Sequence, residues 1–415
     1  MRPARLRGRT FASLRNHRDY RLYFAGNAVS FVGTWMQQIA AYWLVLELTR
    51  SPVAVGALAL VQTLPITVFA LLGGAIADRV DLRRMVIGCE SVLAAVATTL
   101  AALALTGAIE VWHLYALGFA QGVAIALDAP ARHTLVFRIV GRDDLPNAVA
   151  LSSALGTSAR IAGPALGGLV VAAAGPGVAF AVNAASYAFV ICAIVAIRVA
   201  PRPPTGTVTP VLAGIAEGLR FAFGSRRVTV VFLTVLVVGT FSFNFDVLLP
   251  LLAKHTLDEG AEVFGLIAAV FGCGALCGAL ILATVGRARL LLVLGGAAGF
   301  GAFQLLLAPQ ETLLVVCVLL FGAGIFYVLW GSSALATLQL AAPEQLRGRA
   351  ASLYFFAFQG GAPLGGLLAG WLVAHGGTRL AFACAGTVAV VVAGAGTASV
   401  LAVRRPRRAP SQAVP

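Results

Sequence analysis

The chain has 415 residues, of which 60% are hydrophobic and only 11% are charged, and its mean hydropathy is +0.92. A soluble domain carries roughly 25% charged residues, so these charges are too few to cover a water-exposed surface. One very large soluble core is excluded as well, because single cores stop growing near ~250–300 residues. The net charge of +14 does not indicate nucleic-acid binding, because the basic residues lie between apolar segments, as they do in membrane proteins.

Apolar segments long enough to cross a bilayer recur along the chain. A transmembrane helix needs about 20 mostly apolar residues. This criterion predicts an all-α polytopic membrane protein with twelve transmembrane helices, near residues 24–48, 53–77, 85–106, 112–136, 147–172, 177–198, 228–252, 262–284, 289–307, 312–338, 350–373 and 379–403. The first of them lacks the features of a cleavable signal peptide.

A polar segment near the middle of the chain predicts two halves. We expect an N-terminal segment 1–22, a six-helix bundle 23–198, a central loop 199–227, a second six-helix bundle 228–403 and a tail 404–415. The halves carry related sequences, with Gly163-Pro164-Ala165-Leu166-Gly167-Gly168 in the fifth predicted helix and Ala362-Pro363-Leu364-Gly365-Gly366 in the eleventh. Such parallel repeats are typical of transporters, in which the substrate site lies between the repeats.

The basic residues predict the orientation, because cytoplasmic loops carry an excess of Lys and Arg. Nearly all of the 30 Lys and Arg residues fall on the side of the N-terminal segment, the central loop and the tail. The exceptions are Arg50, Lys254 and Arg379 on the other side, and Arg160 within a predicted helix. We therefore expect a multi-pass protein of the bacterial inner membrane with both termini in the cytoplasm.

Polar side chains inside the first and fourth predicted helices are cavity candidates. Asn27, Ser30, Thr34 and Gln38 recur every three or four residues, and Gln121 shares a helix face with Asp128. Polar stripes in membrane helices face protein or a water-filled cavity. Hydrogen bonding between neighbouring helices is the alternative to a cavity here.

The connection between the second and third predicted helices combines a glycine, an acid and three arginines, namely Gly74, Asp78, Arg79, Arg83 and Arg84. The glycine allows two helices to approach closely, and the acid can stabilise a helix N-terminus. The arginines can pair with Asp128 at the inner end of the fourth helix, which would close one face as a gate. In the alternative they only set the topology. Glu90 is expected to pair with arginines of the inner loops.

In the fifth predicted helix the glycines Gly156, Gly163 and Gly167 recur near helical spacing, and the same segment carries Arg160, Pro164 and Gly168. The glycines form a smooth face for close packing, and the proline allows a bend. Arg160 lies roughly 20 Å from the inner start of the helix at the usual rise, and we expect no acid at its depth. It then needs backbone carbonyls, water or an anionic part of a substrate, unless its role is structural.

The second half has fewer candidates. Ser242 and Asp246 share a face of the seventh predicted helix, and a buried carboxyl there can exchange protons near neutral pH. A structural acid near the outer water interface is the alternative. Tyr327 and Trp330 in the tenth helix either form an aromatic wall of the cavity or anchor the helix at the membrane interface.

The connection Gly74–Arg84 resembles the G-x-x-x-D-R-x-G-R-R signature of the major facilitator superfamily, with Asp81-Leu82 around the usual glycine. Together with the span count and the repeat, the resemblance covers essentially the whole chain. The segment from Gly156 to Gly168 resembles the antiporter motif of the family, and Phe243–Pro250 resembles the branch with macrolide-efflux and enterobactin-exporter proteins. Gly118 stands where such exporters usually carry an arginine in the fourth helix, so the proton-relay role of that arginine is not implied.

The resemblance implies proton-coupled efflux of a small amphipathic molecule (a drug, a secondary metabolite or a siderophore) by alternating access. An importer or symporter of a small metabolite on the same scaffold, and a non-transporting receptor or scaffold, are the alternatives. We expect no enzyme activity, no cofactor, no metal and no nucleic-acid partner. The expected partners are the substrate, protons and the lipid bilayer, and the expected state is a monomer.

Overall fold

The structure is a computed structural model that describes residues 11–77, 80–197, 220–285, 290–343 and 347–404. The described part is helical and contains no strand. The helices before the central segment are α1 (Ala12–Asn16), α2 (Arg18–Thr49), α3 (Pro52–Ala77), α4 (Leu82–Leu105), α5 (Val111–Ala174) and α6 (Pro176–Ala196). Those after it are α8 (Arg226–Phe241), α9 (Phe245–Leu251), the π-helix η2 (Leu252–Thr256), α10 (Ala261–Val285), α11 (Leu290–Leu307), α12 (Leu313–Ala341), α13 (Arg347–Gln359) and α14 (Ala362–Arg404).

The described residues contain ten stretches that are long and apolar enough to cross a membrane, so the predicted count of twelve is not fully confirmed. α2 is absent from this set because its polar side chains lower its hydropathy. Residues 353–401 count as one stretch, although the helical backbone is broken at Gly376 and Gly377. The long helix α5, in contrast, contains two such stretches, Val111–Gly141 and Asp143–Ala174. They meet at Gly141, whose φ of 70° is a backbone conformation that glycine adopts without strain.

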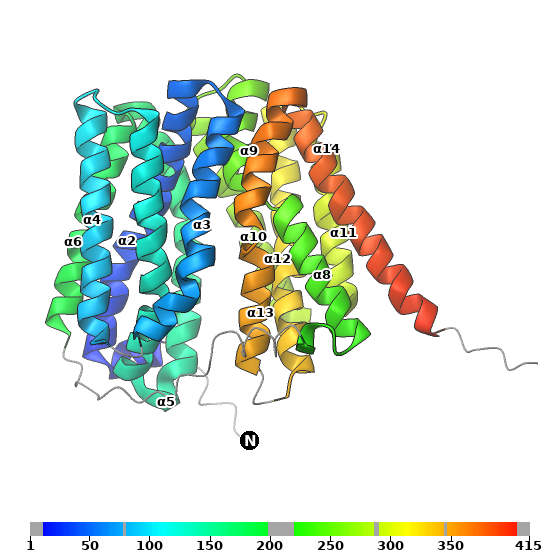
Figure 1. Cartoon of the computed structure of the whole chain (residues 1–415), viewed down its shortest axis with the longest axis horizontal. Helices are drawn as coiled ribbons and strands as arrows, with labels where there is room; N and C mark the ends of the chain where they lie inside the picture. The colour runs from blue at the N-terminus through cyan, green and yellow to red at the C-terminus, as the bar shows by residue number, and fades with distance from the viewer. Residues whose placement is uncertain (1–10, 78–79, 198–219, 286–289, 344–346, 405–415) are drawn as a thin grey trace, which may run out of the picture.

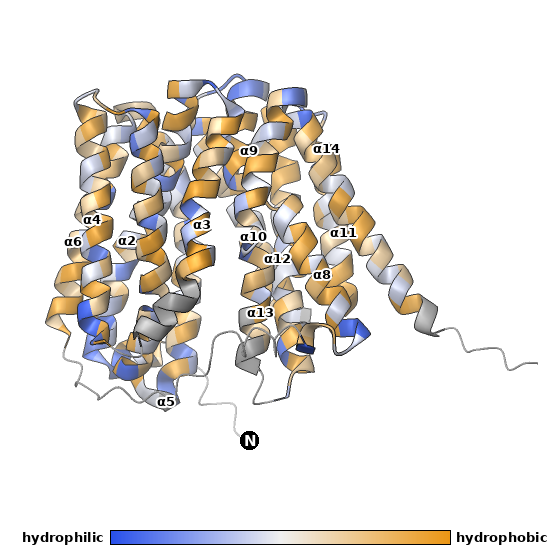
Figure 2. Ribbon diagram, in the orientation of Figure 1, coloured by the Kyte–Doolittle hydropathy of each residue, from blue (hydrophilic) through white to orange (hydrophobic). Residues whose placement is uncertain are grey.

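The helices form two groups side by side, α2 to α6 and α8 to α14 (Figure 1). The described chain begins at α1 and ends at the end of α14 on the same side of the molecule, which we call the termini side. The opposite end is called the far side. Hydrophobic residues dominate the length of the helices, and hydrophilic residues gather towards their ends (Figure 2).

The two groups make close backbone contacts in the half of the molecule towards the far side. A Cβ atom at Gly168 of α5 would lie 2.5 Å from the Ala261 carbonyl oxygen of α10, and one at Gly265 would lie 2.6 Å from the Pro164 carbonyl oxygen. α3 and α14 approach equally closely, since a Cβ atom at Gly56 would lie 2.6 Å from the Gly366 carbonyl oxygen. Glycine is required at these positions because no side chain fits between the helices.

Candidate functional site

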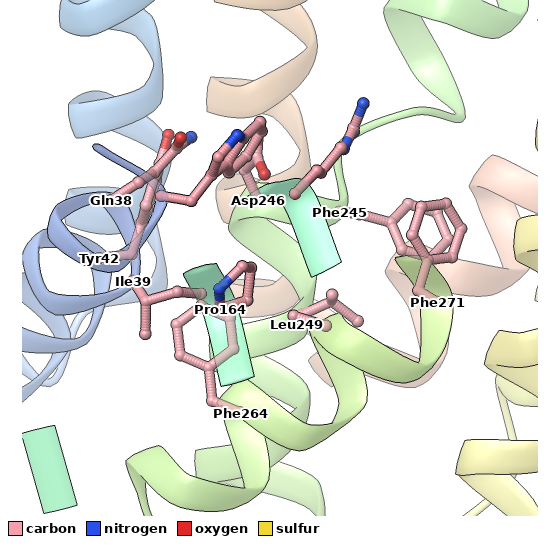
Figure 3. Close-up of a pocket in the computed structure, with 12 residues that line it drawn as sticks. Gln38, Ile39, Tyr42, Pro164, Phe245, Asp246, Leu249, Phe264 and Phe271 are labelled. Carbon is pink, nitrogen blue, oxygen red and sulfur yellow. The ribbon is translucent and has the colours of Figure 1, made fainter. Parts of the chain in front are cut away.

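A cavity lies where the two groups meet, with about 440 Å³ of empty space when the open solvent at the cavity is included (Figure 3). Trp35 and Gln38 of α2 and Arg160 of α5 line it from the first group. Asp246 of α9 and Phe271 of α10 belong to the lining from the second group. An apolar cavity with a few polar groups is the usual form of a small-molecule site.

The guanidinium of Arg160 is surrounded by aromatic rings. Its central carbon lies 5.3 Å from the ring centre of Trp35, 5.5 Å from that of Phe243 and 5.6 Å from that of Tyr327. One of its nitrogen atoms lies 3.5 Å from the Tyr327 hydroxyl, at the limit for a hydrogen bond. Cation–π attraction stabilises the charge here, and no salt bridge to Arg160 occurs among the described residues.

Asp246 faces the same cavity from the other group of helices. Asp246 is exposed to the open space of this cavity, and its charge attracts that of Arg160. The prediction that no acid shares the depth of Arg160 is therefore wrong. The predicted helix is broken, because α8 ends at Phe241 and α9 begins at Phe245, so a count along a straight helix misplaces Asp246.

The other cavity candidates of the second group differ from one another. Tyr327 contacts Arg160 and stacks on Phe243 with ring centres 4.5 Å apart. Trp330 is fully buried and stacks on Phe300, so it is neither a cavity wall nor an interface anchor. Ser242 is also buried, and its hydroxyl donates a hydrogen bond to the Ala385 carbonyl at 2.7 Å.

The polar stripe of α2 mostly faces the interior of the first group. Gln38 lines the cavity, but Asn27 and Ser30 are buried and Thr34 lies 3.2 Å from the Tyr187 hydroxyl of α6. For Asn27, Thr34 and Gln121 the alternative of bonding between helices is the correct one, and Ser30 is buried in the same interior.

Two amides that the sequence analysis missed extend this polar interior. Gln37 donates to Gln121 of α5 at 2.9 Å and accepts from Asn183 of α6 at 2.8 Å. An amide within an apolar segment is the signal that could have identified both. These bonds join three helices of the first group.

Of the arginines in the connection before α4, the two that the structure describes, Arg83 and Arg84, do not pair with Asp128. Asp128 pairs with Arg132, one turn further along α5. Arg83 instead donates to the Ile194 carbonyl at the end of α6 at 2.9 Å, and Arg84 is exposed. The prediction failed for Arg83 and Arg84 because Arg132, one helical turn from Asp128 on the same helix, supplies the cation instead.

The remaining residues of the connection are only partly described. Gly74 lies in α3, and Asp78 and Arg79 lie outside the described residues. A gate at this connection therefore stays a prediction. Glu90 does pair with an arginine, but this arginine is Arg132, which lies in α5 rather than in an inner loop.

The glycines of the fifth predicted helix point in different directions. Gly163 packs on Trp35 of α2, and a Cβ atom at Gly167 would lie 3.0 Å from the Met36 Cα atom. Gly168 faces α10, whereas no atom lies within 4 Å of a Cβ atom at Gly156. Pro164 lines the cavity. Close packing on one face is thus confirmed for Gly163 and Gly167, which both meet α2, but not for Gly156, and Gly168 meets a different helix.

Residues 8–413 match the family described as transmembrane secretion effector. The multidrug efflux pump Tap of Mycolicibacterium fortuitum is 28% identical over 373 residues, which are 86% of this chain and 88% of that protein. The enterobactin exporter EntS of Shigella boydii is 27% identical over 409 residues, 96% of each chain. The staphyloferrin A transporter of Staphylococcus aureus is 25% identical over 268 residues, 63% of this chain and 66% of that protein.

Solved structures show the same fold. The nucleoside transporter NupG has a TM-score of 0.71 at 14% identity, over 92% of this chain and 99% of that one. A bacterial homologue of the human lysosomal transporter Spinster, in an inward-facing and unoccupied conformation, has a TM-score of 0.70 at 11% identity, over 92% of this chain and 95% of that one.

Proposed function

Because this chain belongs to the transmembrane secretion effector family of the major facilitator superfamily, we propose that it exports a small amphipathic molecule in exchange for protons. It is a multi-pass membrane transporter rather than an enzyme, and its relatives include efflux pumps. Proton coupling and alternating access are general properties of this superfamily. The names of the relatives suggest a hydrophobic drug or a siderophore as the substrate.

One observation carries the proposal: Arg160 and Asp246, from different groups of helices, face one aromatic cavity. A cation held by rings rather than by an acid remains available to an anionic group of the substrate, and the rings suit its apolar part. Asp246 takes up a proton when the substrate leaves. Gln38, which lines the cavity, and Tyr327, which lies against Arg160, then contact the substrate.

The two predicted bundles, 23–198 and 228–403, would rock against each other around this cavity. The termini side corresponds to the cytoplasm, since the basic residues gather there. The glycine contacts between α5 and α10 close the far side, so the cavity loads from the cytoplasm in this conformation. Asp78 and the arginines after it would form the opposing contacts once the far side opens. We propose a monomer, because one chain supplies both walls of the cavity.

Inverted membrane vesicles test the proposal. An inside-acid proton gradient should drive an exporter to accumulate compounds from a panel that includes hydrophobic drugs and a catechol iron chelator. Asp246→Asn should abolish accumulation driven by the gradient but leave binding of the compound intact. Glu47→Gln is the matched control, because Glu47 bonds to Trp43 outside the Arg160 cavity. Uptake only under the reversed gradient would favour an importer, and gradient-driven accumulation by Asp246→Asn would exclude Asp246 as the proton carrier.

A further inference from the structure

A second group of ionisable side chains lies inside the first group of helices, away from the cavity. Arg132 of α5 contacts Glu90 of α4, Asp128 of α5 and the side-chain oxygen of Asn27 of α2. We call these four residues the Arg132 cluster. None of them lines the cavity that contains Arg160 and Asp246.

The Arg132 cluster is almost completely shielded from solvent. Glu90 is 0% exposed and Asp128 is 6% exposed, while 13% of the Arg132 side chain is accessible. Glu90 lies about 12 Å along α4 from its first residue at the usual rise of ~1.5 Å per residue, which places the cluster towards the termini side. Arg132 is therefore its most accessible member.

The charges of the cluster do not balance. Among the described residues, two carboxylates face a single arginine. The other described groups whose charges interact with Asp128 are neutral at pH 7, namely Tyr23 of α2, Cys89 of α4 and Tyr187 of α6. With both acids ionised, the buried net charge is −1. An uncompensated buried charge is strongly unfavourable, because neither water nor a counter-ion replaces its lost solvation.

The hydrogen bonds of the cluster are also incomplete. One oxygen of Asp128 (Oδ1) and one of Glu90 (Oε2) are buried and have no hydrogen-bond partner among the described residues. A carboxylate can only accept hydrogen bonds, whereas a protonated carboxyl has one O–H to donate. One added proton would therefore supply the missing donor and cancel the excess charge.

We propose that the Arg132 cluster is a proton-binding site that holds one proton between Glu90 and Asp128. The proton comes from water on the termini side and converts one carboxylate into a carboxylic acid, and Arg132 then neutralises the other carboxylate. The two acids titrate as a pair, because the ionisation of one changes the free energy of ionising the other. This site is separate from Asp246, and its existence does not rest on the direction of transport.

Infrared spectroscopy of the purified protein tests the site without a transport assay. The wild type at neutral pH should show the carbonyl band of a protonated carboxylic acid, which disappears on alkaline titration. Glu90→Gln and Asp128→Asn should each remove this band, because either change leaves one carboxylate balanced by Arg132. Glu47→Gln, on the exposed end of α2, should leave it unchanged.

A change at Arg132 should strengthen the carbonyl band instead of removing it. Arg132→Gln leaves two buried acids without a cation, so the band should grow about twofold as both become protonated. Size-exclusion chromatography and circular dichroism identify variants that do not fold. The wild-type spectrum shows without any variant whether a protonated carboxylic acid is present at neutral pH. The proposal is overturned if the wild type has no such band at neutral pH. It is also overturned if only one of the two carboxyl changes removes the band, since charge balance requires both to act.

Discussion

The contact between α5 and α10 allows a direct test of how the far side closes. A Cβ atom at Gly265 would lie 2.6 Å from the Pro164 carbonyl oxygen and 2.8 Å from the Gly168 Cα atom. Ordinary contacts begin near 3.4 Å, and both neighbours are backbone atoms that cannot rotate away. Gly265→Ala should therefore push the two helices apart by roughly 0.6–0.8 Å and destabilise the conformation in which they touch.

The size of the effect follows from the cost of overpacking, which is typically ~1–3 kcal/mol. If the contact exists only when the far side is closed, the ratio of closed to open molecules should fall by about 5- to 150-fold. Gly156→Ala is the matched control on α5, because no atom lies within 4 Å of its Cβ position. Both changes exchange glycine for alanine in a helix, so the general gain in helix stability is the same.

Spin-label distances measure the outcome. The six native cysteines are first replaced, and labels are attached after Ala108→Cys in the α4–α5 connection and Glu311→Cys in the α11–α12 connection, both exposed on the far side. Gly265→Ala should enrich the longer distances relative to the parent protein and to Gly156→Ala. Equal distance distributions in all three proteins would refute the idea that this glycine contact sets far-side closure.

Three further changes have expected outcomes. Arg160→Lys keeps the charge but loses the planar group that faces three rings. The Kd of an anionic amphipathic fluorophore should therefore rise about 2- to 30-fold, which corresponds to a total loss of ~0.5–2 kcal/mol, and an unchanged Kd would argue against these contacts. Arg83→Ala removes the bond to the Ile194 carbonyl and should lower stability in detergent by about 1 kcal/mol. Arg84→Ala, at an exposed position, should change it by less than ~0.5 kcal/mol. Equal melting temperatures of the two variants would contradict this expectation. Trp330→Ala should lower the free energy of unfolding by ~3–5 kcal/mol. Trp330→Phe should lower it much less, because the indole N–H has no partner among the described residues. Similar losses of stability in both variants would contradict this and indicate a hydrogen bond to the indole.

Much of the fold was predictable from the chain alone, because the bilayer sets the length of each apolar segment and excludes unpaired backbone groups from its core. The glycine pattern likewise predicted close helix packing, which the structure confirms at Gly163 and Gly167 but not at Gly156. The antiporter-like and exporter-like segments predicted the family that the comparisons show.

The partners of the polar residues were not predictable in the same way. Gln37 and Gln38 are adjacent in the sequence, yet the first bonds to α5 and the second lines the cavity, because successive residues of a helix point about 100° apart. The rotation of α2 decides which of them faces the cavity, and that rotation is set by packing against α5 and α6. Asp246 shares the cavity with Arg160, and the helix is interrupted between Phe241 and Phe245, a break that no periodic pattern of apolar residues records. The sequence by itself thus determined which segments cross the membrane and where small residues allow helices to approach closely. Only the tertiary structure decided which charges share a site, because the grouping of charges depends on helix rotation and on where the backbone bends.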